Sequence, residues 1–379
     1  MTIGILREPA EDRRVVMLPE TVGQIVKMNV QVKVEAGAGS GAMIADDDYI
    51  KAGATISSKN EISSSSQILL KINAMSKDEI NSIPASTVLV NEFQPLVNKD
   101  IVLALLEKNI TSFSMDMIPR TTRAQAMDIL SSQATAAGYK AVLLAATNLP
   151  KFFPMFMTAA GSIVPAKVLI LGAGVAGLQA IATAKRLGGV VEVFDTRAAV
   201  KEEVKSLGAK FIEVEGAADS AAAGGYAVEQ SKEFLERQKQ KIQESAMKSD
   251  VIICTAQIPG RKAPVLITTQ TVEGMKAGSV IVDLAASTGG NCEVTKNNET
   301  ISYMGVTVIG NSYLPSTIPA DASKMFGKNV QNFLKLIINK EGNLNLNFED
   351  DIVKGSCITH NKEIIHPKVK ETISSQPTA

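Results

Sequence analysis

AKVLILGAGVAGLQAIATAKRLGGVVEVFD, residues 166–195, decides the fold of this chain. AKVLIL is the short apolar run typical of a buried strand, and GAGVAG (residues 172–177) follows it as a tight turn. LQAIATAKRLG then has a helical pattern, and GVVEVFD forms a second strand that ends at Asp195. The stretch therefore predicts one strand-turn-helix-strand unit.

The glycines of this turn have the spacing GxGxxG of a dinucleotide-binding fingerprint. Gly172 permits the sharp turn, Gly174 lets the backbone approach a pyrophosphate, and Gly177 lets helix and strand pack closely. The helix N-terminus offers N–H groups and the positive end of the helix dipole. Asp195, eighteen residues after Gly177, stands where a carboxylate accepts from the ribose hydroxyls. A buried βαβ unit without a ligand is the alternative that the glycines alone leave open.

The charge at the end of the second strand bears on which dinucleotide binds. Asp195 repels a 2′-phosphate and so favours NAD over NADP, while Arg197 nearby works against that preference. The predicted contacts to the adenosine and pyrophosphate half are Gly172, Ala173, Gly174, Val175, Ala176, Gly177, Asp195, Thr196 and Arg197.

Length and composition exclude several classes of function. The 379 residues allow two to three domains, and 45% hydrophobic content is ample for large cores. Because 39 Lys and Arg residues balance 39 Asp and Glu residues, the chain has no basic field for nucleic acid or anionic lipid. Trp is absent and aromatic residues make up 4%, which disfavours a stacking platform for bases.

Cysteine usage and the N-terminus predict an intracellular chain. Cys254, Cys292 and Cys357 are odd in number and form no CxxC pair, which is typical of a reduced compartment. The N-terminal MTIGILREPAEDRR lacks the apolar segment of a signal peptide. The longest apolar tract, residues 159–184, is interrupted by proline, lysine and glycine, so we expect turn and strand there rather than a bilayer helix.

Histidine is scarce, and this limits the chemistry. His360 and His366 are the only two, and both lie near the C-terminus, where exposed loop positions are expected. A dehydrogenase acting on an alcohol or amine must usually remove a proton as the hydride leaves, and histidine most often does so. The body of the chain would therefore use Lys, Tyr or a carboxylate, or its chemistry needs no proton acceptor.

The first 116 residues alternate short strands with helical patterns, which predicts a parallel sheet with helices on both faces. We expect residues 58–66, SKNEISSSS, to form a polar surface helix, because a linker would interrupt the alternation. The expected strands are residues 2–6, 30–37, 67–72, 86–92 and 109–116, with a helix near residues 19–28.

Residues 118–146 follow as IPRTTRAQAMDILSSQATAAGYKAVLLAA. Pro119 with the two threonines after it predicts a loop and a helix start, and residues 124–146 are expected to form one long helix that bridges two domains. A solvated helix end with local charge pairing is the alternative, and spacing alone favours it. The polar residues clustered at the start of this helix are Arg120, Gln125, Asp128 and Ser131.

Two segments outside the fingerprint are predicted to be loops. Residues 151–162 are a Phe- and Met-rich loop, and residues 215–225, EGAADSAAAGG, form a small-residue run before Tyr226. Long flexible segments in α/β domains are functional lids or disordered, and glycine hinges at Gly224 and Gly225 beside one aromatic residue favour a lid. An amphipathic helix is expected at residues 229–247.

Loops that follow the strands of a doubly wound sheet line the cofactor crevice. Strands are expected at residues 250–256 and 279–285, and the turn Gly289, Gly290 and Asn291 is expected to serve only as a turn or to join that lining. The further predicted cofactor contacts are Gly225, Thr255, Ala256, Gln257, Asp283, Leu284 and Ala285.

The C-terminal segment is predicted to return to the first domain. A helix is expected at residues 323–339, followed by short strand-like pieces. The expected fold is α/β, with two doubly wound, Rossmann-like domains and a cofactor cleft between them. The first comprises residues 1–126 plus 320–379, and the second, which binds NAD(H), comprises residues 127–319.

Several motifs resemble one family along essentially the whole chain. They are REPAEDRRVVMLPE, RTTRAQAMDILSSQ, MTAAGSIVPAKVLILGAGVAGLQAIATAKRLG, AGGYA, IPGRKAPVLIT, VDLAASTGGN and SCITH. These look like the soluble NAD(H)-binding component, domain I or alpha-1 subunit, of proton-translocating nicotinamide nucleotide transhydrogenase, a family related to alanine dehydrogenase.

The resemblance implies a reaction and its partners. It implies direct, Re/Si-specific hydride transfer between NAD(H) here and NADP(H) on a partner domain, coupled to proton translocation by a membrane subunit, with no activity without partners. It further implies a homodimer, cytoplasmic and held at the inner membrane through its partners. Arg120, Gln125 and Asp128 match the family's loop at the nicotinamide end, with Ser131 beside it. Tyr226, following Gly225, matches the tyrosine of a mobile loop.

Alanine dehydrogenase is the main alternative. Arg14 and Lys71 match its substrate-carboxylate and substrate-carbonyl positions, yet VNEFQPL (residues 90–96) lacks the expected histidine, and Ser287 replaces an aspartate. Hydride transfer between two nicotinamides needs no proton acceptor, only proximity, orientation and exclusion of water. A non-catalytic NAD-binding module also stays open, and a saccharopine-dehydrogenase-like enzyme is a more distant alternative.

Overall fold

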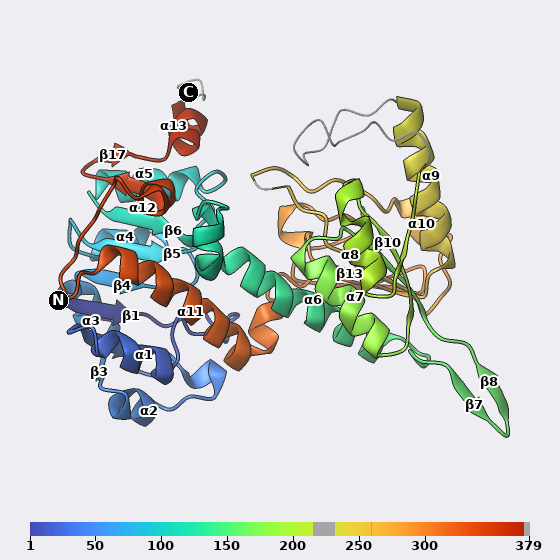
Figure 1. Ribbon diagram of the computed structural model, residues 1–379, viewed down its shortest axis with the longest axis horizontal. Coiled ribbons are helices and arrows are strands. Elements are labelled where there is room, and N and C mark those ends of the chain that lie inside the picture. Colours follow the sequence, from blue (N-terminus) through green and yellow to red (C-terminus); the bar gives the residue numbers. More distant parts are fainter. Residues whose placement is uncertain (215–231, 259, 375–379) are drawn as a thin grey trace. The chain divides into compact units, whose positions relative to one another are not determined.

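The computed structural model describes residues 1–214, 232–258 and 260–374 of the chain, which forms two compact units. Unit 1 comprises residues 1–133 and 315–379, and unit 2 comprises residues 134–314. Each unit is built around one large, mostly parallel sheet with helices packed against it (Figure 1). The expected α/β class with two doubly wound units is confirmed.

The sheet of unit 1 has the strand order β17-β16-β6-β5-β4-β1-β2-β3. Strands β1 to β6 run parallel, and β16 pairs antiparallel with β6 at a register shift. The order reverses between β1 and β4, and the carboxyl ends of strands at such a switch point are the usual place for ligands in doubly wound sheets. The strands are β1 Thr2–Ile5, β2 Gln31–Glu35, β3 Thr55–Ser57, β4 Ile68–Leu70, β5 Val88–Asn91, β6 Thr111–Ser114, β16 Cys357–His360 and β17 Glu363–Ile364.

Both faces of this sheet are buried, because alternate side chains of each strand enter two different cores. Ile68 and Leu70 pack in the core that contains α1 and α11, and Leu69 packs in the core that contains α3, α4 and α5. The helix expected at residues 58–66 is confirmed as α3, with Ser58 accepting from Glu61 N at its start. The helices are α1 Pro19–Val26, α2 Asp46–Lys51, α3 Lys59–Ser65, α4 Lys77–Ser82, α5 Lys99–Glu107, α11 Pro319–Ile337, α12 Asp351–Ser356 and α13 Pro367–Ser374.

The sheet of unit 2 has the strand order β11-β10-β9-β12-β13-β15-β14, in which only β14 is antiparallel to its neighbour. From β11 to β15 this is the order 3-2-1-4-5-6 of dinucleotide-binding folds. The edge pair β14–β15 did not enter the sequence prediction. The strands are β9 Lys167–Leu171, β10 Val190–Phe194, β11 Lys210–Phe211, β12 Val251–Cys254, β13 Val280–Asp283, β14 Thr300–Tyr303 and β15 Val306–Ile309.

Helices cover both faces of this second sheet as well. One core joins the sheet to α6, α7 and α8, and the other joins it to α9 and α10. Gly138 of α6 lies against α7, because a Cβ at Gly138 would stand 2.1 Å from the carbonyl oxygen of Ala176. This close approach explains a glycine inside a long helix. The helices are α6 Ile129–Asn148, which begins in unit 1, α7 Val175–Arg186, α8 Lys201–Ser206, α9 Lys232–Lys248 and α10 Thr269–Glu273.

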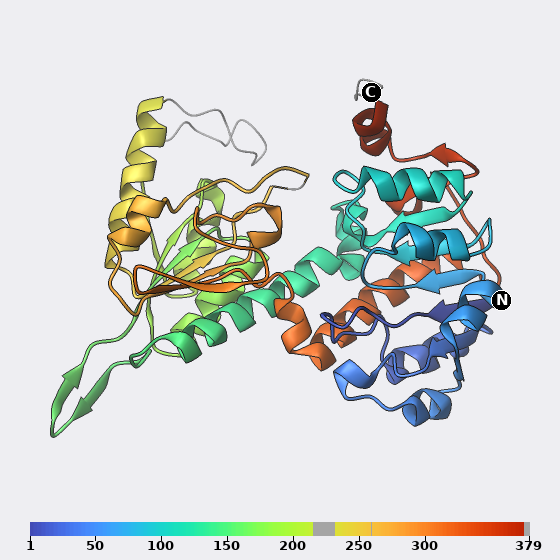
Figure 2. The ribbon, with the colours of Figure 1, turned by 180° about the vertical axis from the view of Figure 1, so that it is seen from behind.

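The Phe- and Met-rich segment is a hairpin, not the loop that the sequence predicted. Strands β7 (Phe156–Thr158) and β8 (Gly161–Ile163) pair antiparallel and form a small sheet of their own. Figure 2 shows the hairpin extending from the body of unit 2, and all six of its strand residues are exposed. Across the part of the chain that the structure describes, no helix combines the length and apolarity needed to cross a bilayer.

Candidate functional site

The glycine turn of unit 2 joins β9 to the N-terminus of α7. Gly172 adopts φ +102°, a conformation that favours glycine. A Cβ at Gly177 would lie 1.9 Å from the carbonyl oxygen of Gly172, whereas a Cβ at Gly174 would meet no atom within 4 Å. The turn is therefore closed on its inner side and open at Gly174, the N-cap of α7. The first N–H groups of a helix have no partner within the helix, so this open side suits a phosphate. Ala173 lies in the same turn, and Val175 and Ala176 are the first two residues of α7.

Asp195 lies directly after β10, beside this turn. Its Oδ2 accepts from Ala173 N at 2.7 Å and from Arg197 Nη2 at 2.9 Å, and its Oδ1 accepts from Arg197 N at 2.8 Å and Arg197 Nε at 3.0 Å. Burial disfavours the charged carboxylate, but the bonds from Arg197 and Ala173 outweigh burial and hold the pKa of Asp195 below its ordinary value. The structure thus brings the predicted ribose and phosphate residues together.

The loop after β12 is fixed by Thr255 and Asn291. Thr255 Oγ1 lies within bonding distance of the carbonyls of Leu171 and Gly172, at 3.1 and 3.0 Å. Asn291 Nδ2 donates to the carbonyls of Ala256 and Pro264, both at 2.8 Å, and its Oδ1 accepts from Ala256 N at 3.0 Å. Asn291 therefore clamps both the N–H and the carbonyl of Ala256, which is more than the simple turn that its sequence context favours.

Asp283, at the end of β13, holds the backbone of Asn291 in place. It is fully buried, and its Oδ2 accepts from Asn291 N at 2.8 Å, Cys292 N at 3.0 Å and Thr295 Oγ1 at 2.8 Å. Its Oδ1 accepts from Ala285 N at 2.9 Å. Burial raises the pKa of Asp283 against the lowering effect of these donors. The side chain of Asp283, predicted as a cofactor contact, thus faces its own loop and positions it.

The neighbouring predicted residues differ in exposure. Ala285 is buried, whereas Gln257 is exposed and donates from Nε2 to the carbonyl of Leu284 at 2.7 Å. This bond connects the loops after β12 and β13 on their outer side. Thr196 is exposed next to Asp195. Gly225 and Tyr226, the predicted hinge and lid residues, lie outside the described residues.

The polar cluster at residues 120–131 belongs to unit 1, and the helix predicted there is broken. Residues Thr122–Met127 form a short 3-10 helix (η3), Asp128 is extended with ψ 95°, and α6 begins only at Ile129. The carboxylate of Asp128 accepts from Ser131 N at 2.9 Å and Ser131 Oγ at 2.6 Å. Asp128 therefore caps α6, and this capping interaction ends the 3-10 segment.

Four side chains from the C-terminal segment hold η3 in place. Asn329 and Asn332 of α11 donate to the carbonyl of Ala126 at 2.9 and 3.1 Å. Arg123 forms two 2.7 Å bonds to Asp350 at the start of α12 and also contacts the neighbouring Asp351. Arg120 and Gln125 lie on this anchored loop with exposed side chains. The loop therefore offers two polar side chains on a fixed backbone.

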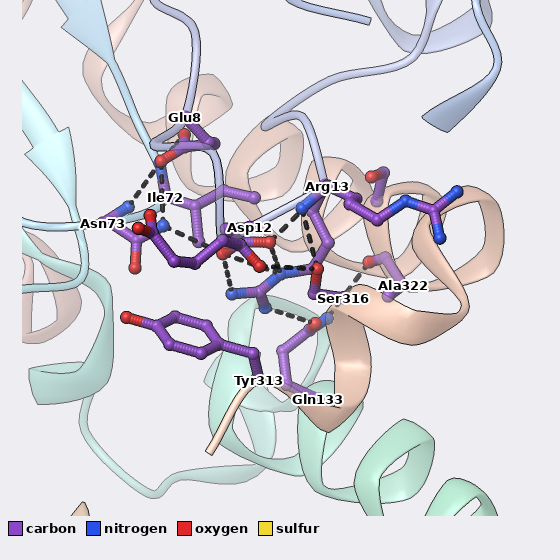
Figure 3. A network of polar contacts seen from close by, with 12 residues as sticks. Glu8, Asp12, Arg13, Ile72, Asn73, Gln133, Tyr313, Ser316 and Ala322 are labelled. Atoms are coloured by element: carbon purple, nitrogen blue, oxygen red, sulfur yellow. Dashed lines mark hydrogen bonds and ion pairs between the residues drawn. The ribbon is translucent and has the colours of Figure 1, made fainter. Parts of the chain in front are cut away.

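A buried polar network lies at the switch point of unit 1, where β1 and β4 end (Figure 3). Arg14 donates to both carboxylate oxygens of Asp12, from Nε at 2.9 Å and Nη2 at 2.5 Å, and from Nη1 to Gln133 Oε1 at 2.8 Å. Asn73 Nδ2 bridges Glu8 at 3.0 Å and Asp12 at 2.9 Å. Burial raises the pKa of Glu8 to about 7. The guanidinium of Arg14 thus has internal partners.

Lys71 is buried beside this network and has its own partner. Its Nζ lies 3.1 and 3.2 Å from the two carboxylate oxygens of Glu79. Arg14 and Lys71 are the two residues that match the substrate-binding positions of alanine dehydrogenase. Asp12 and Glu79 already neutralise them in this structure, so a substrate carboxylate would have to compete with internal carboxylates.

These features define a dinucleotide-binding α/β protein of two doubly wound units. The comparisons with known proteins extend that assignment. Family profiles for the N-terminal and C-terminal domains of alanine dehydrogenase/PNT match residues 4–137 and 141–367, and the chain belongs to this family.

Individual relatives place the chain within the family. An NAD(P) transhydrogenase alpha-subunit chain of Rhodospirillum rubrum is 46% identical over 370 residues, which cover 95% of this chain and 96% of that protein. A crystal structure of transhydrogenase from Sinorhizobium meliloti aligns with TM-score 0.88 at 39% identity, over 96% of this chain and 100% of that one. Alanine dehydrogenase of Mycolicibacterium smegmatis is 28% identical over 76% of this chain and 74% of its own length. The resemblance to transhydrogenase is confirmed, with alanine dehydrogenase as a more distant relative.

Proposed function

We propose that this chain is the NAD(H)-binding component of a proton-translocating transhydrogenase. It exchanges hydride, with Re/Si specificity, between NAD(H) and NADP(H) held by a partner subunit, and a membrane subunit couples this exchange to proton movement. The observation that carries the proposal is the turn that is open at Gly174 and bonded through Ala173 to Asp195. This geometry fits a pyrophosphate at the turn, with the carboxylate of Asp195 beside it for the adenosine ribose. The similarity to named transhydrogenase subunits supports the choice of reaction.

The residues of the chain serve this reaction by positioning. The nicotinamide ring of bound NAD(H) supplies or accepts the hydride. The amides at the start of α7 would hold the pyrophosphate, Asp195 would hold the adenosine ribose, and Arg120, Gln125 and Asp128 would hold the nicotinamide end. The family resemblance gives Tyr226 the role of covering the bound nucleotide. Orientation and exclusion of water suffice because transfer between two nicotinamides releases no proton to a base.

The structure also bears on the alanine dehydrogenase alternative. Asp12 forms an ion pair with Arg14, and Glu79 forms one with Lys71. Ser287 stands where that enzyme is expected to have an aspartate. An amine or imine step would therefore have no prepared carboxylate site and no obvious base. These observations favour transhydrogenase over amino-acid oxidation.

The test is an absorbance assay of the purified chain with NADH. We expect saturable NADH binding, no NADH oxidation with pyruvate and ammonium, and hydride transfer to a nicotinamide analogue once an NADP(H)-binding partner is added. Steady NADH loss with pyruvate and ammonium would contradict the proposal in favour of alanine dehydrogenase. Binding without transfer beside a competent partner would leave a non-catalytic NAD-binding module.

Gln125→Asn tests the loop at the nicotinamide end. We expect the Kd for NADH to stay close to that of the unmodified chain and the transfer rate in stopped-flow to fall by about 10-fold, because the shorter amide no longer reaches the ring from its anchored backbone. Gln240→Asn on α9, an exposed glutamine remote in sequence from this loop, serves as the control. A transfer rate equal to that of the unmodified chain would refute this role of Gln125.

The homodimer in this proposal finds support in the β7–β8 hairpin. Met157 is 76% exposed, and Phe152 and Phe156, which are 53% and 41% exposed, lie edge to face at 4.6 Å. Large apolar side chains gathered on one exposed element are typical of an interface between chains. We propose that the hairpin contacts a second copy of the chain.

Met157→Asp is expected to shift the chain from dimer to monomer in light scattering, because a charge desolvated in an apolar contact is costly. Met304→Asp provides a matched control, since Met304 is also exposed and lies in the turn between β14 and β15. A Met157→Asp chain that stays dimeric at the same concentration would remove the hairpin from the interface.

A further inference from the structure

Asp195 has no acceptor capacity left in this structure. A carboxylate offers about four acceptor positions. Two on Oδ1 are taken by the backbone and Nε of Arg197, and two on Oδ2 are taken by Ala173 N and Arg197 Nη2. Two of these four bonds come from one guanidinium, in the forked arrangement that fits a carboxylate best. A ribose diol, which donates two O–H bonds, therefore has to displace the guanidinium.

The guanidinium is placed so that it can leave. The side chain of Arg197 is 43% exposed, whereas that of Asp195 is 6% exposed. Arg197 is the N-cap of the short helix η4 (Ala198–Val200), and residues 196–199 are all exposed. The two other donors to Asp195 are backbone amides, and they stay in place when the side chain moves. Displacement thus costs one partly exposed ion pair and leaves the carboxylate oriented by the two backbone amides.

We propose that Arg197 is a latch on the ribose site that competes with the ribose hydroxyls for Asp195 and lowers the selectivity for NAD(H) over NADP(H). The inference rests on the proposed function, since it assumes that Asp195 binds the adenosine ribose. While paired, Arg197 cancels the charge of Asp195 and removes the repulsion of a 2′-phosphate. Once displaced, its guanidinium is two residues from the carboxylate, within reach of a 2′-phosphate. The latch makes NAD(H) binding weaker and more easily reversed than Asp195 alone would make it.

Arg197→Met keeps an aliphatic side chain and the backbone amide but removes the guanidinium that donates two hydrogen bonds to Asp195. We expect the variant to bind NADH and ADP-ribose about 5- to 10-fold more tightly than the unmodified chain in calorimetric titration, the scale of a partly exposed charge-assisted pair. Binding of NADPH is expected to weaken, because the carboxylate is no longer neutralised. Arg197→Lys, which keeps the charge without the fork, is expected to fall between the two.

The remaining measurements separate a latch from a structural role. The difference in NADH affinity between the Arg197→Met chain and the unmodified chain is expected to shrink as salt rises, since salt screens the ion pair. Arg186→Met at the end of α7, an exposed arginine of the same unit, is expected to change no affinity. If the unmodified chain binds NADH and Arg197→Met binds it equally or more weakly, the latch is overturned while the proposed function stands. If the unmodified chain does not bind NADH at all, the proposed function itself fails.

Discussion

Gly174→Val is expected to raise the Kd for NADH at least about 100-fold, equivalent to about 2.7 kcal/mol, while the chain stays folded. A Cβ at Gly174 meets no protein atom within 4 Å, and the backbone there has φ −76°, which any residue adopts. The added side chain therefore projects from an unobstructed Cβ into the space proposed for the pyrophosphate. Losing glycine at a helix N-cap costs about 1 kcal/mol, so the Tm falls by only about 2–4 °C.

Gly177→Val is the matched comparison in the same turn. Its Cβ would stand 1.9 Å from the carbonyl oxygen of Gly172, so the turn cannot keep its shape. We expect this variant to lose thermal stability and NADH binding together. Thermal unfolding and fluorescence titration of the two variants separate packing from ligand contact. NADH affinity unchanged in Gly174→Val would mean that no phosphate binds at this turn.

The elements that the sequence predicted correctly are those determined by short-range patterns. The strand, turn, helix and strand of residues 166–195 appear as β9, the glycine turn, α7 and β10, because a buried strand and a glycine fingerprint are both local signals. The polar helix α3 was predictable because Ser58, the residue directly before it, accepts a hydrogen bond from Glu61 N in the first turn of the helix. These local preferences agree with the fold, so reading them needs no knowledge of distant contacts.

The elements that the sequence missed depend on contacts far apart in the chain. The start of α6 was misplaced because Asp128 caps the helix, and η3 before it is held by Asn329 and Asn332, some 200 residues away. The β7–β8 hairpin carries exposed apolar residues on both strands, so it lacks the alternation by which strands are recognised. Helix α12 is six residues long and was hidden in a stretch with strand-like pieces.

The candidate site shows the same division between local and distant information. Gly172, Gly174 and Asp195 could be named from spacing, but the pairing of Asp195 with Arg197 required side-chain geometry. Asn291 follows two glycines, where turn chemistry is the ordinary explanation. Its bonds to Ala256 form only because β12 and β13 are neighbours in the sheet, across 35 residues of sequence. No local pattern distinguishes such a clamp from a turn.

Asn291→Asp is expected to cost about 3 kcal/mol of unfolding free energy and to loosen the nucleotide site. The change replaces the donor Nδ2 by an acceptor, so the carbonyls of Ala256 and Pro264 lose their bonds and face a buried carboxylate. In a unit of this size the loss lowers the Tm by about 6–12 °C. Because Ala256 belongs to the loop predicted to line the nucleotide, the Kd for NADH is expected to rise as well.

The pH dependence distinguishes this mechanism from a general packing defect. Burial raises the pKa of the introduced carboxyl in the folded chain above its unfolded value, so protonation favours the folded state. The stability lost at pH 7 is therefore expected to be regained in part as the pH falls, when the protonated oxygen donates again to one carbonyl. Asn297→Asp is the control, because exposed Asn297 only accepts, from Ser312 Oγ at 2.6 Å, and aspartate keeps that bond. Thermal unfolding of both variants across the pH range measures the difference, and equal stability of the two at pH 7 would remove Asn291 as the clamp of this loop.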